Sequence, residues 1–324
     1  MRYLITGGAG FIGSHLAETL VRRGDWVTIL DNLSTGSLEN IEDLTDAGLS
    51  DFHFGDVQDR DIVEKLVDEA DFVVHLAAAL GVKLILEKPV ESIETNVTGT
   101  QIVLEAAARS RTPVLIASTS EVYGKSTKIP FCEDDDIVLG PTRKSRWSYA
   151  ASKMLDEFLA LSYWEEKNLP AIVVRFFNTV GPRQNGRYGM VLPNFVHQAL
   201  EDAPITIHGD GKQSRCFCDV RDTVEAVTKL IDARPFGEVF NIGSTQEVSI
   251  EELALLVRNR TGSHSQILYT PYNQAYGSGY EDMQRRVPSV DKLHRCTGFR
   301  PQIALREIID HTAAYMRSAM ANVI

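Results

Sequence analysis

The stretch that most constrains the fold of this chain is a glycine-rich turn near its start. Apolar residues 3–5 are typical of a buried strand, and around Gly7, Gly10 and Gly13 the apolar pattern changes to the spacing of a helix face. In such a strand–turn–helix unit the first glycine permits the tight turn, the second lets backbone approach a pyrophosphate, and the third lets the helix pack on the strand. The free N–H groups at the start of the helix then face the phosphates. The sequence therefore predicts a dinucleotide-binding loop.

The residue that ends the next expected strand indicates which dinucleotide is bound. The glycine spacing is G-x-x-G-x-x-G rather than G-x-G-x-x-G, and the turn alone is weak evidence because many such turns carry glycines for packing only. Residues 26–30 form the next apolar run, which ends at Asp31. A carboxylate there accepts hydrogen bonds from ribose hydroxyls and repels a 2′-phosphate. We expect NAD rather than NADP; the alternative is that Asp31 is only a strand-end turn residue.

Composition and charge exclude several classes of protein. Of the 324 residues, 44% are hydrophobic and 24% charged, and the formal net charge of −11 argues against nucleic acid or an anionic membrane as a bulk partner. We expect a cytoplasmic protein, because the N-terminus shows no secretory signal and no apolar run approaches the ~20 residues of a membrane span. The four cysteines (Cys132, Cys216, Cys218 and Cys296) do not resemble a disulfide framework. Cys216 and Cys218 fit alternate positions of one strand better than a metal site.

Strands and helices alternate through the first half of the chain, which predicts an α/β fold with a doubly wound parallel sheet. The expected strands cover residues 3–5, 26–30, 52–56, 72–78, 113–117 and 171–177, and the expected helices cover about 59–69, 91–110 and 149–167. Residues 238–243 suit a strand that returns to the main sheet. We therefore expect an NAD-binding domain of residues 1–178 plus about 216–245. A smaller interleaved α/β lobe of about 179–215 and 246–324 would bind substrate over the carboxyl ends of the strands.

Two residues in one expected helix point to proton-transfer chemistry. Tyr149 and Lys153 lie one turn apart on a single face of that helix. A free tyrosine has a pKa of ~10, and a nearby ammonium, helped by an oxidised nicotinamide, favours the phenolate and makes Tyr149 a usable base at neutral pH. A Tyr-x-x-x-Lys pattern is common by chance and is usually a surface pair. Thr119 strengthens the prediction, because it ends a strand beside the cofactor crevice and its hydroxyl can share the substrate hydroxyl with Tyr149.

Together these motifs resemble the extended short-chain dehydrogenases/reductases of the nucleotide-sugar epimerase, dehydratase and decarboxylase group. The resemblance covers nearly the whole chain, and it also includes Asp56 and residues 118–124 (STSEVYG), 175–178 (RFFN), 181–183 (GPR) and 211–215 (GKQSR). It implies a Rossmann-like fold, tightly held NAD and hydride transfer from a sugar carbon, usually C4, with Tyr149 as base and Thr119 assisting. It also implies that Asn178 and Arg215 hold the nucleotide diphosphate, and that Arg286 lies in a segment reaching back over the substrate.

The motifs and the resemblance assign expected roles to a defined set of residues. The expected cofactor-binding residues are Gly7, Gly10, Phe11, Ile12, Gly13, Asp31, Asn32, Asp56, Val57, Leu76, Ala77, Ala78, Tyr149 and Lys153. The expected substrate-binding residues are Ser120, Asn178, Val191, Arg215 and Arg286. The expected catalytic residues are Thr119, Glu121, Tyr149, Lys153 and Arg286. No metal site is expected.

The residues after Thr119 separate the members of this group. Dehydratases of the group carry Thr-Asp-Glu there, whereas Ser120 is a poor proton donor for a leaving hydroxyl at C6. UDP-glucuronate decarboxylases resemble the chain in having Thr-Ser-Glu, which includes Glu121, together with an arginine at the place of Arg286. Residues 140–149, 211–217 and 276–282 also resemble the decarboxylase domain of the bacterial polymyxin-resistance enzyme, whereas residues 179–189 resemble proteins labelled only as sugar epimerases.

The resemblance therefore favours an NAD-dependent UDP-glucuronate decarboxylase that acts through a 4-keto intermediate. The 4-keto uronate is a β-keto acid that loses carbon dioxide readily, and the product is either UDP-xylose or a 4-keto pentose. A UDP-sugar 4-epimerase acting on UDP-glucose or UDP-glucuronate is the alternative. A regulator that binds NAD without turnover is a third possibility, although such proteins typically lack the Tyr/Lys pair. A homodimer is expected, because helices 91–110 and 149–167 each carry a second apolar run; a core role alone is the competing explanation.

Overall fold

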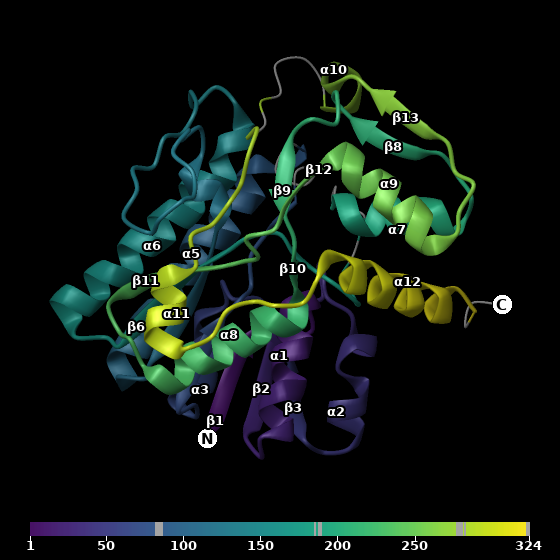
Figure 1. Cartoon of the computed structure of the whole chain (residues 1–324). Helices are drawn as coiled ribbons and strands as arrows, with labels where there is room; N and C mark the ends of the chain where they lie inside the picture. The colour runs from purple at the N-terminus through teal and green to yellow at the C-terminus, as the bar shows by residue number, and fades with distance from the viewer. Residues whose placement is uncertain (82–86, 185, 187–189, 277–280, 282, 322–324) are drawn as a thin grey trace.

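A seven-stranded sheet forms the centre of the structure (Figure 1). The structure is a computed structural model, and it describes residues 1–81, 87–184, 186, 190–276, 281 and 283–321. Across the sheet the strands are β11 (Glu238–Ile242), β6 (Ala171–Phe176), β5 (Val114–Thr119), β4 (Phe72–His75), β1 (Arg2–Thr6), β2 (Trp26–Asp31) and β3 (Ser50–Phe54). All neighbouring strands in this sheet are parallel. The chain order reverses between β1 and β4, and doubly wound sheets bind their ligands at the carboxyl ends of the strands beside such a point. The predicted fold class is confirmed.

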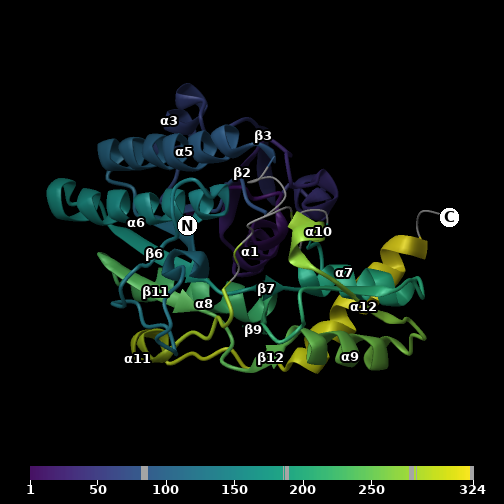
Figure 2. The ribbon, with the colours of Figure 1, turned by 90° about the horizontal axis from the view of Figure 1, so that it is seen from above.

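Helices cover both faces of this sheet. One face carries α1 (Phe11–Arg22), α8 (Val220–Ala233) and α11 (Asp291–Thr297), and the other carries α3 (Arg60–Asp68), α5 (Pro89–Ser110) and α6 (Ser148–Lys167) (Figure 2). Successive side chains of a strand point to opposite faces, so Ile5 of β1 packs in the apolar cluster of α1 while its neighbour Leu4 packs in that of α3. Shorter helices are α2 (Glu42–Asp46), η1 (Leu38–Asn40), η2 (Ser120–Tyr123) and η3 (Ser145–Trp147).

A smaller lobe with an apolar core of its own lies beside the carboxyl ends of the strands (Figure 1). Its helices are α7 (Val191–Leu200), α9 (Ile250–Thr261), α10 (Tyr272–Tyr276) and α12 (Leu305–Ala321). Three pairs of short strands lie outside the central sheet: β7 (Thr179–Val180) with β10 (Cys218–Asp219), β8 (Ile205–His208) with β13 (Ile267–Thr270), and β9 (Ser214–Cys216) with β12 (Glu247–Ser249). Phe195 of α7, Leu253 of α9 and Ile308 of α12 are buried together in this core.

The fourth expected strand is shorter than the sequence predicts. β4 ends at His75 rather than at residue 78. The amide of Leu76 still donates to the carbonyl oxygen of Thr6 in β1 at 3.0 Å, but two amides further on are bound by side chains. Ala77 N donates to Thr6 Oγ1 at 3.3 Å, and Ala79 N donates to Asn96 Oδ1 at 2.8 Å. The chain therefore leaves the sheet before residue 78, and its next residues, the alanines 77–79, pass toward α5.

The two neighbouring cysteines lie on different strands, which corrects the expectation of alternate positions on one strand. Cys216 ends β9, which pairs with β12, and Cys218 begins β10, which pairs with β7. Both side chains are buried. The chain changes its strand partner between them, and apolar burial of the two thiols accounts for the Cys-x-Cys spacing.

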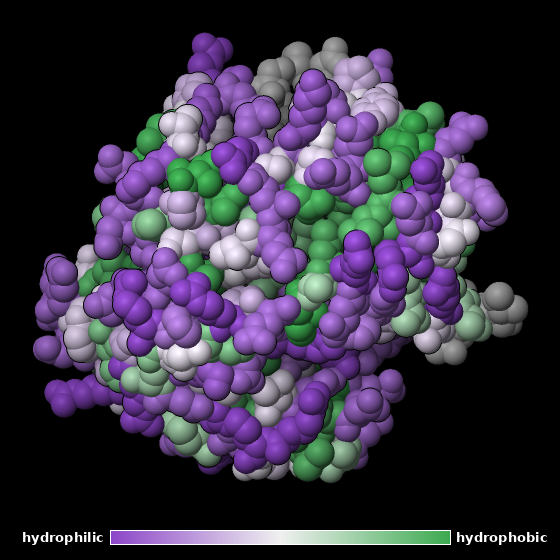
Figure 3. Space-filling model, in the orientation of Figure 1, coloured by the Kyte–Doolittle hydropathy of each residue, from purple (hydrophilic) through white to green (hydrophobic). Residues whose placement is uncertain are grey.

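The outer surface is mostly hydrophilic on the face shown in Figure 3, with smaller apolar areas between. Within the residues that the structure describes, no helix combines the length and the apolar character needed to cross a membrane. Some of the residues that carried the resemblance to decarboxylases and to epimerases lie outside the described residues. They are residues 185, 187–189, 277–280 and 282.

Candidate active site

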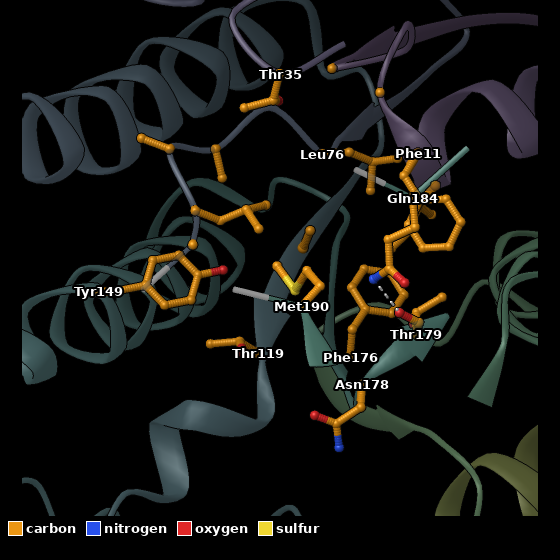
Figure 4. Close-up of a pocket in the computed structure, with 18 of the residues that line it drawn as sticks. Phe11, Thr35, Leu76, Thr119, Tyr149, Phe176, Asn178, Thr179, Gln184 and Met190 are labelled. Carbon is orange, nitrogen blue, oxygen red and sulfur yellow. Dashed lines mark hydrogen bonds between the residues drawn. The ribbon is translucent and has the colours of Figure 1, made fainter. Parts of the chain in front are cut away.

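A cavity of about 920 Å³ lies between the carboxyl ends of the sheet strands and the smaller lobe. Tyr149 and Thr119 lie on one side of it, and Phe11 and Gln184 on the other (Figure 4). All residues with an assigned role line this cavity: Gly7, Gly10, Phe11, Ile12, Gly13, Asp31, Asn32, Asp56, Val57, Leu76, Ala77, Ala78, Thr119, Ser120, Glu121, Tyr149, Lys153, Asn178, Val191, Arg215 and Arg286. The structure therefore brings the expected cofactor, substrate and catalytic residues to one place, and the individual roles stay predictions.

The glycine turn packs too closely for side chains at two of its glycines. Gly7 has a φ of +72°, and a Cβ on it would meet the backbone nitrogen of Ala77 at 2.8 Å. A Cβ on Gly13 would collide with the carbonyl oxygen of Gly7. Gly10 is the N-cap of α1 and has no side chain to cap the helix, so the first amides of α1 are left for an anion. These residues fit a dinucleotide whose pyrophosphate lies on the turn.

Carboxylates follow β2 and β3 on the expected adenosine side of the cavity. Asp31 ends β2, is 8% exposed, and accepts hydrogen bonds from Ala9 N at 3.0 Å and from Leu33 N at 2.8 Å. Burial raises the pKa of Asp31, while these backbone hydrogen bonds lower it in part. Asp56, after β3, accepts a hydrogen bond from Asn32 Nδ2 at 2.7 Å. The Asp31 carboxylate is thus fixed at the cavity wall, where ribose hydroxyls can donate to it.

Tyr149 lies in the first turn of α6 and lines the cavity. Its hydroxyl forms a hydrogen bond with Thr119 at the end of β5. Burial raises the pKa of Tyr149, and the carboxylates of Glu121 and Asp156 raise it further. Lys153, one turn further on, donates from Nζ to Asp156 Oδ2 at 2.7 Å. In the chain by itself, burial and these carboxylates keep the pKa of Tyr149 above its ordinary value. The predicted shift toward the phenolate includes the help of an oxidised nicotinamide and stays a prediction.

Two arginines hold the carboxylate of Glu121 in η2. Arg146 of η3 donates from Nη1 to Oε2, and Arg286 Nη1 lies 3.4 Å from Oε1. Burial by itself would raise the pKa of Glu121, but the charges of Arg146, Arg286 and Arg215 lower it to about 2. The carboxylate therefore stays ionised at neutral pH. It can orient a water or a substrate hydroxyl, but it is not a proton donor in this arrangement.

The end of the cavity expected to hold the diphosphate is built from β6 and β9. Asn178 follows β6 with a φ of +37°, and its side-chain amide donates to the carbonyl oxygen of Cys216 at 3.0 Å. Arg215 on β9 is buried and donates from Nη1 to the carbonyl oxygen of Ser214 at 2.7 Å. Val191 begins α7 on the same wall. The Asn178 hydrogen bond ties the end of the central sheet to the strand that carries Arg215.

Residues 3–243 match the model of the NAD dependent epimerase/dehydratase family. The chain belongs to this family. Its members named below are enzymes, so the family identity makes this chain an enzyme with NAD as its cofactor. The glycine turn and the buried Asp31 carboxylate fit that cofactor on their own geometry.

Members of the epimerase/dehydratase family resemble the chain over nearly its whole length. It is 45% identical over 317 residues to UDP-N-acetyl-α-D-glucosaminuronate decarboxylase of Bacillus cytotoxicus, covering 98% of each chain. It is 34% identical over 319 residues to UDP-glucuronic acid decarboxylase 1 of Xenopus tropicalis, covering 98% of this chain and 73% of that protein. Among solved structures, a mutant UDP-glucuronic acid 4-epimerase of Bacillus cereus, in complex with a UDP-uronic acid analogue and NAD, has a TM-score of 0.89 at 26% identity and covers 98% of this chain and 100% of that one.

The sequence analysis missed two charged residues in or beside the cavity of this chain. Arg146 is 3% exposed and contacts Glu121, although a charged residue just before a helix is more typical of surface. Its place in the segment 140–149, which carries the resemblance to decarboxylases, was the available signal. Asp156 pairs with Lys153 but had no such signal, because acidic residues on helices usually face solvent.

Proposed function

We propose that the chain catalyses the NAD-dependent decarboxylation of a UDP-linked hexuronate through a 4-keto intermediate. The observation that carries this proposal is the ionised Glu121 between Arg146 and Arg286, directly beside the Tyr149–Thr119 pair. The decarboxylases among the relatives support it. Their names specify uronates that differ at C2, with an acetamido group in one and a hydroxyl in the other. The higher identity to the first makes UDP-N-acetylglucosaminuronate a substrate to test beside the UDP-glucuronate predicted from the sequence.

In the proposed reaction the residues around Tyr149 assist the oxidation of the sugar at C4, in which the hydroxyl proton goes to Tyr149 and NAD would accept the hydride. The phenolate of Tyr149 takes the proton of the C4 hydroxyl, and Thr119, already hydrogen-bonded to Tyr149, orients that hydroxyl. NAD supplies the hydride acceptor and, in its oxidised form, a positive charge that lowers the pKa of Tyr149. Lys153 and Asp31, with the glycine turn, would hold the cofactor. The product of this step is a 4-keto uronate.

Carbon dioxide loss follows from the chemistry of this intermediate. The C6 carboxylate is then β to a ketone, so the electrons of the C5–C6 bond move toward the C4 oxygen as carbon dioxide leaves. A proton delivered to C5 then replaces the carboxylate that was lost. Arg146 and Arg286 would attract the C6 carboxylate, while the fixed charge of Glu121 keeps them from neutralising it fully. A carboxylate held too well by cations would not leave, so this balance of charge is the reason we assign decarboxylation.

A UDP-sugar 4-epimerase is the second candidate, because it shares the oxidation at C4. The solved UDP-glucuronic acid 4-epimerase of similar fold favours it. In that reaction the keto sugar rotates and takes back the hydride on its other face, and the carboxylate is retained. Incubation with both UDP-uronates and with UDP-glucose, read by mass spectrometry, tests the two. Loss of carbon dioxide supports the decarboxylase, and an isomer of unchanged mass supports the epimerase.

We also propose that the chain forms a homodimer through α5 and α6. These helices pack side by side on the outside of the sheet (Figure 2). Each carries exposed large apolar side chains. They are Val90 (65% exposed) and Ile93 (41%) on α5, and Leu155 (43%) and Phe158 (61%) on α6. A second copy of the chain would cover them.

The predicted division into two domains stays a proposal, as does a cytoplasmic location, which rests on the sequence alone. The apolar core shared by α7, α9 and α12 supports a separate substrate lobe made of about 179–215 and 246–324. Within the second of these ranges, α11 packs against α8 and β11 of the NAD-binding part, 1–178 plus about 216–245. The two parts therefore share an interface as well as the cavity between them.

A further inference from the structure

Lys153 forms a buried ion pair with Asp156, and neither the family motifs nor the proposed reaction requires this partner for the lysine. Lys153 and Asp156 lie on adjacent turns of α6, with the two side chains 2% and 0% exposed. The ammonium donates to the carboxylate at 2.7 Å. Breaking a pair of this kind is costly, because it leaves one charge buried and unpaired. The Lys153 ammonium is therefore held in one place beside the cavity.

Other elements packed around this pair add little charge of their own. From β4, His75 lies between the hydroxyls of Thr6 and Thr100, and burial lowers the pKa of His75 to about 3, so the ring is neutral. Thr100 of α5 is uncharged. Glu157, the next residue on α6, is bound by two hydrogen bonds from the Arg175 guanidinium, at 2.9 and 2.7 Å.

The charged groups that act on Tyr149 include Asp156, which pairs with Lys153, and Glu121, which pairs with Arg146. In each pair the carboxylate opposes the phenolate and the cation favours it. Burial raises the pKa of Tyr149 most, the Glu121 and Asp156 carboxylates raise it further, and Arg146 lowers it. With both pairs intact, each of these cations is accompanied by a carboxylate that opposes its effect on Tyr149.

We propose that Asp156 is a positioning residue, which fixes the Lys153 ammonium beside the cavity and offsets its charge at Tyr149. Tyr149 then keeps its proton until the cofactor adds positive charge, so base strength is coupled to cofactor binding. This inference rests on the proposed function only in taking Tyr149 as the base at C4. It holds equally for decarboxylation and for epimerisation.

The test is the pH dependence of turnover in Asp156→Asn. The asparagine keeps the size of the side chain and an acceptor for Lys153, but removes the negative charge. The acid limb of the profile, measured with saturating NAD, should move to lower pH by about one unit. Asp156→Glu keeps the charge and should restore the wild-type limb. Glu165→Gln, which removes an exposed carboxylate from the same helix, is the matched control and should leave it unchanged.

An acid limb that stays in place or moves to higher pH in Asp156→Asn overturns the inference, since a purely structural role would lower the rate at every pH. Asp156→Ser, a smaller neutral side chain, gives the same test if the asparagine variant does not fold. The ionisation of Tyr149 can also be followed without turnover, from the ultraviolet difference spectrum between each NAD-loaded protein and its Tyr149→Phe counterpart. That reading separates the inference from the proposed function, because it needs no substrate.

Discussion

Glu121→Gln separates the two stages of the proposed reaction. The amide keeps the shape of the side chain and removes the charge that Arg146 and Arg286 hold. The pKa of Glu121 is about 2 against an ordinary 4.5, which corresponds to roughly 3 kcal/mol in favour of the ionised form. The depressed pKa means that this contribution to stability is complete above about pH 4.5 and is lost as the pH falls toward 2. We expect the variant to unfold at lower temperature than the wild type, because Arg146 and Arg286 lose the charge with which they pair.

The catalytic effect of the same substitution should be selective. Release of carbon dioxide should fall by up to about 10²-fold, because each 1.36 kcal/mol of the roughly 3 kcal/mol associated with this charge is worth a factor of ten in rate. Reduction of NAD at C4 should persist, because Tyr149, Thr119 and Lys153 are untouched. Both are measured on one sample, by trapping labelled carbon dioxide and by following the absorbance of reduced nicotinamide. Glu94→Gln, an exposed carboxylate on α5, is the control. Equal loss of both activities, or normal carbon dioxide release, would refute the role given to Glu121.

The remaining predictions concern the cofactor, the base and the assembly. Asp31→Ala should weaken the preference for NAD over NADP in equilibrium binding, and equal or tighter binding of NADP by the unmodified protein would contradict the assignment. Tyr149→Phe should lower turnover by ~10²–10⁴-fold while NAD stays bound in ultrafiltration; near-normal turnover would show that another group is the base. Light scattering at micromolar concentration should give the mass of a dimer, and Phe158→Glu should give a monomer by placing a charge in the proposed interface. A monomeric wild type would exclude the dimer.

The fold and the glycine turn were predictable from local patterns, whereas substrate-side residues such as Asn178, Arg215 and Arg286 were assigned from the family resemblance. The glycine turn, the apolar strands and the helix at 149–167 each specify their own backbone, and parallel strands bring their carboxyl ends to one edge. Gly7 and Gly13 could be assigned from spacing alone, since the turn leaves no room for a Cβ. The end of β4 at His75 could not, because the path of the residues after it involves contacts with distant parts of the chain, such as the hydrogen bond from Ala79 to Asn96.

The electrostatics of the cavity depended on contacts that spacing does not reveal. From the sequence Asp156 is expected to be a solvated carboxylate, whereas in the structure it is buried, pairs with Lys153 and raises the pKa of Tyr149. Arg146 likewise becomes a partner of Glu121 only when η2 and η3 are brought together. Pairs of charges are set by tertiary packing, so the protonation state of a predicted site is less accessible from sequence than its location.

The most direct test of the proposed decarboxylation is incubation of the wild-type protein and NAD with UDP-glucuronate and UDP-N-acetylglucosaminuronate, each labelled at C6. Mass spectrometry then follows the label in the gas phase and in the nucleotide sugar. We predict that the label from at least one of them appears as carbon dioxide and that the nucleotide sugar formed is an unlabelled UDP-pentose or its 4-keto form. A nucleotide sugar that retains the label and differs from the substrate only in its configuration at C4, with no labelled carbon dioxide, would contradict the account.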